Sequence, residues 1–77
     1  MRPLRATYET DRAAAHSAIC HMRWALGAAG RGAMFSALRD MYTAHQWVGS
    51  VYDRRLRERL DRALVKASDQ LCAEVLS

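Results

Sequence analysis

The chain has 77 residues, 51% hydrophobic and 26% charged, and its 12 Lys and Arg against 8 Asp and Glu give a net charge of +4. This composition describes one small domain over residues 1–77, and it excludes both a multidomain protein and the dense basic blocks of strong nucleic-acid binders. One core of this size seldom contributes more than about 5 kcal/mol, so a disulfide, a metal or self-association is expected to support it.

The N-terminal part of the chain is predicted to hold an extended lead-in followed by one helix. Residues 1–9 form the lead-in, and the helix runs from about residue 10 to residue 28. Its apolar face is expected to comprise Ala15, Ala18, Ile19, Met22, Leu26 and Ala29. Three glycines between Gly27 and Gly32 predict a turn over residues 29–32.

Residues 33–76 are predicted to be helical, because they contain no proline and one glycine, Gly49. Apolar positions advance by three or four residues without a phase slip, at Met34, Leu38, Met41, His45, Val48, Tyr52, Leu56, Leu60, Ala63, Ala67 and Leu71. Two arrangements are open. The region is either one helix of about 65 Å, or it bends at Gly49-Ser50 into a third helix with Ser50 as N-cap. The fold class is therefore all-α, a helical hairpin or a small three-helix bundle.

Self-association is expected for this chain. In the one-helix arrangement, the first helix covers less than half of the second, and the stripe beyond residue 50 would face water. We therefore predict a homodimer whose seam comprises Tyr52, Leu56, Leu60 and Ala63.

The two tryptophans lie outside the apolar stripes of their helices. Trp24 and Trp47 each point about 180° away from the main stripe at 100° per residue. Because tryptophan is enriched at binding hot spots, both are predicted to anchor a partner protein. The alternative is that they seal the ends of a short bundle.

A run of charge between Asp53 and Arg62 is the most distinctive electrostatic pattern. At helical spacing a basic ridge forms on one flank, made of Arg55, Arg59, Arg62 and Lys66. Such a ridge could follow nucleic-acid phosphates or bind an acidic protein surface. Pairs four residues apart, such as Arg54 and Glu58, make a solvated helix face the competing interpretation.

The cysteines and histidines predict no catalytic, metal or cofactor site. His16 and Cys20 are adjacent on a helix, but a metal needs three or four converging ligands and a nucleophilic cysteine needs an oxyanion hole. Cys20 and Cys72 form no disulfide framework, which favours the reducing cytoplasm. Neither a signal peptide nor a run of 18 apolar residues is recognised, so no membrane association is expected.

These observations predict a small non-enzymatic helical module that acts as a regulator, adaptor or inhibitor by binding a partner protein. The alternative is a dimeric nucleic-acid-binding regulator that uses the basic ridge. Eleven of the 12 basic residues are arginine, whose codons are GC-rich, so a high-GC bacterial or phage genome is the expected origin.

Overall fold

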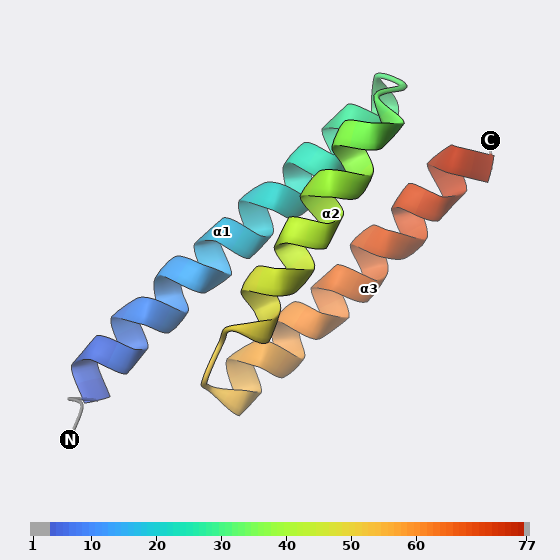
Figure 1. Ribbon diagram of the computed structural model, residues 1–77. Coiled ribbons are helices and arrows are strands. Elements are labelled where there is room, and N and C mark those ends of the chain that lie inside the picture. The colour runs from blue at the N-terminus through green and yellow to red at the C-terminus, as the bar shows by residue number, and fades with distance from the viewer. Residues whose placement is uncertain (1–3, 77) are drawn as a thin grey trace.

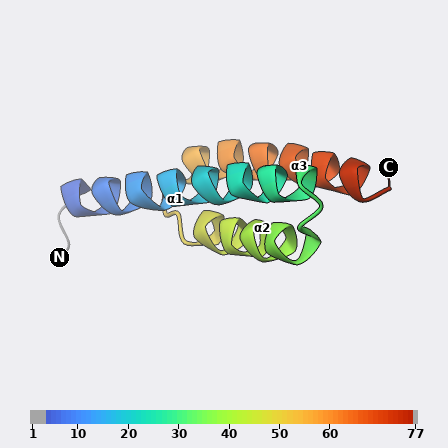
Figure 2. The ribbon, with the colours of Figure 1, turned by 90° about the horizontal axis from the view of Figure 1, so that it is seen from above.

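The computed structural model describes the backbone of residues 4–76 and the side chains of residues 10–76. Residues 4–76 form three helices that pack together: α1 (Leu4–Gly30), α2 (Met34–Gly49) and α3 (Arg54–Leu76). No strand occurs in this range, so the all-α prediction is confirmed. α1 and α2 form an antiparallel hairpin, and α3 returns beside them (Figure 1). Seen from above, α2 and α3 lie on either side of α1, whose first turns project beyond the bundle (Figure 2).

The first helix is longer than predicted at both ends. α1 begins at Leu4, so the extended lead-in is wrong for residues 4–9, while residues 1–3 lie outside the described part of the chain. Neither proline nor glycine occurs between Leu4 and Leu26, so nothing in the sequence stops the helix from propagating there. α1 ends at Gly30, and the turn occupies residues 31–33 rather than 29–32.

The turn after α1 is a glycine-terminated helix cap. Gly32 has a φ of 81°, a left-handed conformation that glycine adopts without strain. The N–H of Ala33 donates to the carbonyl of Ala28 at 2.8 Å, and the N–H of Gly32 donates to that of Ala29 at 3.0 Å. These two bonds satisfy carbonyls that the helix end leaves open, and they reverse the chain into α2.

The structure has the three-helix arrangement rather than one helix over residues 33–76. α2 ends at Gly49 and α3 begins at Arg54. Ser50 is the C-cap of α2, and its hydroxyl donates to the carbonyl of Trp47 at 2.7 Å. Its predicted role as N-cap of the third helix is therefore wrong. Asp53 stands directly before α3, and its Oδ1 accepts the N–H of Arg55 at 3.3 Å, as an N-cap does.

Alanine dominates the contact between α1 and α2. Ala18 and Ala25 of α1, like Ala37 and Ala44 of α2, are 0% exposed, and each pair is seven residues apart. Small side chains at this spacing let two helices approach closely along one seam. α1 and α2 accordingly share the most extensive contact of the bundle. α3 is held mainly by its buried residues Leu60, Leu64, Ala67 and Leu71.

The buried helix faces are rotated relative to the predicted stripes. Ile19 and Leu38, both expected inside, are 41% and 56% exposed, whereas Ala25 and Ala37 are fully buried. His45 of the predicted stripe is exposed as well. Alanines occupy the fully buried positions at which α1 and α2 approach closely, and Ile19 and Leu38 lie outside this contact. Large apolar residues are consequently left at the surface.

Candidate functional site

The two predicted anchors, Trp24 and Trp47, lie on one face of the α1–α2 hairpin. His21 of α1 contacts Asp40 of α2, which sets the register of the two antiparallel helices. Trp24 follows His21 by one turn and Trp47 follows Asp40 by two turns, so the indoles lie on either side of this contact. We call Trp24, His21, Asp40 and Trp47 the tryptophan face.

A half-buried polar pair stands between the two indoles. Nδ1 of His21 lies 3.2 Å from Oδ1 of Asp40, and each side chain is 23% exposed. A carboxylate oxygen accepts, so Nδ1 carries the proton of this hydrogen bond. The Trp24 ring meets the His21 ring edge-on, with ring centroids 4.9 Å apart and an interplanar angle of 85°. Asp40 thus holds His21, and His21 supports one side of Trp24.

Both indoles of the tryptophan face remain open to solvent. Trp24 is 57% exposed and Trp47 is 40% exposed. Sequence spacing indicated these two residues but not the pair between them, because His21 and Asp40 are 19 residues apart and belong to different helices. The residues next to His21 and Asp40 in the sequence do not indicate that these two side chains meet.

The four residues of the predicted dimer seam do not form one exposed strip. Leu60 is 5% exposed, and Leu56 is partly buried against the core. Tyr52 is 66% exposed in the linker between α2 and α3, and Ala63 is exposed on α3. The three-helix packing therefore covers within one chain much of the stripe that a single long helix would leave open.

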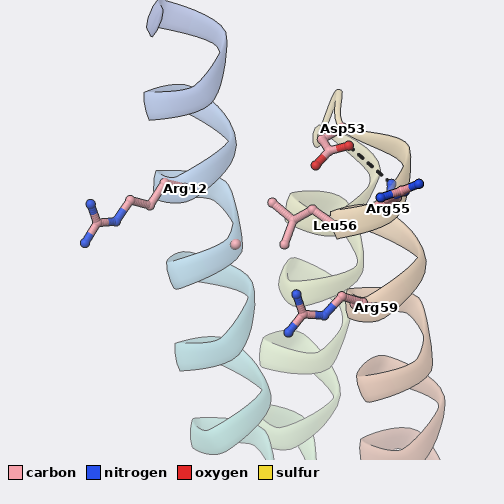
Figure 3. Close-up of a pocket in the computed structure, with 6 residues that line it drawn as sticks. Arg12, Asp53, Arg55, Leu56 and Arg59 are labelled. Carbon is pink, nitrogen blue, oxygen red and sulfur yellow. Dashed lines mark hydrogen bonds between the residues drawn. The ribbon is translucent and has the colours of Figure 1, made fainter.

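All four residues of the basic ridge, Arg55, Arg59, Arg62 and Lys66, are exposed. Arg55 and Arg59 border a hollow of about 430 Å³ between α1 and α3, together with Arg12 of α1. Figure 3 shows Arg59 extending toward α1, whereas Arg12 points away from α3. Arg12 was not part of the predicted ridge, because only tertiary packing brings it beside α3. We call this site the basic hollow.

Few carboxylates neutralise the basic hollow. Asp53 lines it, but its Oδ1 already accepts the N–H of Arg55. Within the described chain, no carboxylate lies at ion-pair distance from Arg12, Arg55 or Arg59. By contrast Arg54, on the same helix, pairs with Glu58 at 3.2 Å between Nε and Oε1, as the four-residue spacing predicted.

Asp11 fixes the wall of the basic hollow. Its side chain is 4% exposed, and it is the buried charged residue among the side chains that the structure describes. Oδ1 accepts the N–H of Tyr52 at 2.9 Å, and Oδ2 accepts the N–H of Asp53 at 2.8 Å. This carboxylate ties α1 to the linker before α3. Sequence reasoning missed this role, because Asp11 is 41 and 42 residues away from the two backbone groups that it binds.

The remaining candidate residues, His16 and Cys20, are neighbours on one helix. His16 and Cys20 are adjacent as their spacing predicted, with 3.6 Å between Nε2 and Sγ. Over residues 10–76, no three His, Cys, Asp or Glu side chains lie close enough to hold a metal ion together. None of the helices described is long and apolar enough to cross a bilayer.

Comparison with known proteins adds no relative to this description. No protein-family model matches the chain, and neither a curated protein nor a solved structure does. The functional argument therefore depends on the tryptophan face and the basic hollow.

Proposed function

We propose that this protein is a non-enzymatic helical interaction module that regulates, adapts or inhibits a partner protein through its tryptophan face. One observation carries the proposal: exposed Trp24 meets His21 of the half-buried His21–Asp40 pair, and exposed Trp47 follows Asp40 by two turns, which puts it on the same side of α2. Tryptophan is among the residues that contribute most to binding energy at protein interfaces.

The tryptophan face has the length and the chemistry to bind one segment of a partner protein. Trp24 and Trp47 are separated by about 15 Å along the hairpin axis, or three turns of helix. Aromatic anchors around a polar pair supply apolar contact area together with one hydrogen-bonding group. Because His21 already supports Trp24, less side-chain freedom is lost on binding than for an unsupported indole.

The proposed setting is the cytoplasm of a high-GC bacterium or of a phage that infects it. The free thiols of Cys20 and Cys72 and the arginine-rich composition support this setting. The proposal also includes self-association into a homodimer, which is supported by the large apolar side chains left at the surface.

The test is capture of the partner from a native lysate of the host cells, with the captured protein identified by mass spectrometry. We expect Trp24→Ala and Trp47→Ala each to weaken capture by about thirtyfold, the loss typical of a hot-spot residue. Tyr52→Ala is the matched control, since Tyr52 is 66% exposed and lies outside the tryptophan face. Circular dichroism should show unchanged helicity in all three variants. Equal capture by both tryptophan variants and by the wild type would reject this face.

A second candidate function is nucleic-acid binding by the basic hollow. The observation in its favour is that Arg12, Arg55 and Arg59 border one hollow, toward which Arg59 extends. Guanidinium groups on one surface bind phosphates, and the released counterions make such binding sensitive to salt.

Mobility shift of DNA and RNA fragments at several salt concentrations tests this second candidate. If it is correct, affinity falls steeply between about 50 and 200 mM salt, and Arg55→Ala with Arg59→Ala lowers the salt slope by about two. Arg23→Ala with Arg31→Ala removes the same charge from exposed positions outside the hollow and serves as the control. Absence of any shift at low salt would exclude nucleic-acid binding.

A further inference from the structure

An open groove runs between α2 and α3. One hollow of about 350 Å³ is lined by Leu38, Leu71, Cys72, Val75 and Leu76. A second hollow of about 430 Å³ is lined by His45, Asp61, Leu64, Val65, Ser68 and Asp69. Both hollows take their walls from α2 and α3 alone, and together we call them the α2–α3 groove. It is separate from the tryptophan face and from the basic hollow.

Large apolar side chains without cover gather along this groove. On α2, Phe35 stands one turn before Leu38, and Tyr42 stands one turn after it. The exposed apolar side chains that line the groove are Leu38 (56%), Val65 (60%), Val75 (55%) and Leu76 (86%), and Phe35 (93%) and Tyr42 (65%) stand beside Leu38 on α2. Apolar residues gathered on one surface in this way mark an interface rather than the scattered exposure of an ordinary surface.

The exposed area of the chain is what a dimer would need to cover. The accessible surface is 5923 Å², whereas a compact protein of 8.7 kDa has about 4,700 Å². The surplus of about 1,200 Å² exceeds the roughly 800 Å² that each partner buries in a standard protein interface. Part of this surplus belongs to the first turns of α1, which project beyond the bundle (Figure 2), and the rest leaves area for one further copy of this chain to cover.

We propose that a second copy of the chain occupies the α2–α3 groove in a two-fold arrangement, with the two α2 helices antiparallel. A two-fold interface must be self-complementary, so each copy needs both a projecting group and a hollow to receive it. Phe35, 93% exposed, projects at one end of the groove, and the hollow beside Leu64 and Val65 lies at the other end. A two-fold axis that crosses α2 at the level of Asp40, midway between Phe35 and His45, places Phe35 of each copy over that hollow of the other.

The charges along the groove favour the same arrangement. Arg39 lies beside Phe35 and Leu38 at one end, while Asp61 and Asp69 line the hollow at the other end. The antiparallel arrangement brings Arg39 of each copy to the level of Asp69 on α3 of the other. Complementary charge therefore favours this orientation of the two copies. This inference rests on the proposed self-association and is independent of the tryptophan face.

Sedimentation equilibrium and light scattering test the projecting residue first. We expect the wild-type chain to have the mass of two copies, and Phe35→Ala to raise the dimer dissociation constant by about a hundredfold. The effect is large because a two-fold interface loses a hot-spot aromatic residue twice. Tyr52→Ala is the matched control, because it removes an exposed aromatic ring that belongs to the sequence-predicted seam and lies outside the groove; it should leave the constant unchanged. Phe35 is exposed, so circular dichroism should show the variant folded.

Charge reversal then tests the orientation. Arg39→Asp alone, and Asp61→Arg with Asp69→Arg, should each raise the dissociation constant at least about tenfold, and all three changes in one chain should restore it. Arg62→Asp is the control for net charge, since Arg62 belongs to the basic ridge.

The possible outcomes distinguish a dimer formed through the α2–α3 groove from a dimer formed through another surface. A wild-type chain that stays monomeric at millimolar concentration would overturn both. A dimer that responds to Tyr52→Ala but not to Phe35→Ala or to charge reversal would overturn the groove and leave self-association standing. Capture through Trp24 and Trp47 is a separate measurement and is unaffected by either result.

Discussion

At the scale of single residues, Asp11 determines where α3 starts. The N–H groups of Tyr52 and Asp53 precede α3 and have no partner within a helix, and the Asp11 carboxylate accepts both. Asp53 in turn caps α3 through the N–H of Arg55. The position of the first turn of α3, and of the basic hollow beside it, therefore depends on one buried side chain of α1.

Replacement of Asp11 is expected to destabilise the fold more than any surface change. Asp11→Ala leaves two N–H groups without their charged acceptor, so the free energy of unfolding should fall by about 3 kcal/mol. Asp11→Asn keeps one acceptor oxygen and should lose about half as much. Urea denaturation of the two variants beside the wild type measures both values. Equal stability of Asp11→Ala and the wild type would contradict a stabilising role for the hydrogen bonds from Tyr52 and Asp53 to Asp11.

At the scale of helices, the alanine seam explains why α1 and α2 pair most closely. Ala18 and Ala25 of α1 and Ala37 and Ala44 of α2 have no exposed surface. Close approach along such a seam gives many van der Waals contacts from small side chains. Ile19 and Leu38 lie outside this contact and leave apolar surface exposed.

Enlarging a residue of the alanine seam is expected to weaken the hairpin. Ala18→Leu inserts three carbon atoms into a contact that has no free volume, so it should cost about 1–3 kcal/mol of unfolding free energy despite the better apolar side chain. Ala13→Leu is the matched control, because Ala13 lies exposed on the same helix. Thermal and urea denaturation compare the two. A stabilised Ala18→Leu variant would show that α1 and α2 are not closely packed.

At the scale of the whole molecule, the elongated bundle offers a different surface along each pair of helices. Its extents are 50 × 18 × 12 Å, and its radius of gyration is 13.6 Å, against about 11.5 Å for a compact chain of this length. The tryptophan face lies along α1 and α2, and the basic hollow lies along α1 and α3. The α2–α3 groove lies along the remaining pair of helices. A dimer formed through the groove would present the other two surfaces twice, so its binding would gain from avidity.

Local information in the chain was enough to predict the all-helical class and the first reversal of the chain. The three- and four-residue spacing of apolar positions predicted helices alone, and the glycines after Leu26 predicted the reversal into α2. The choice between one and two helices after Ala33 could not be made from spacing, because the stripe continues in phase across Gly49. In the structure the chain forms a separate third helix, and its Leu60, Leu64 and Leu71 pack into the core with the first two helices.

The all-α class and the reversal after the first helix were readable from the sequence, because they depend on neighbours within a few residues. The identity of the buried face, the His21–Asp40 pair and the role of Asp11 were decided only by tertiary structure. Each depends on residues at least 19 positions apart, and on how closely two helices can approach. Burying alanine in place of leucine and isoleucine is favourable only when a second alanine face stands opposite, and no single helix contains that information.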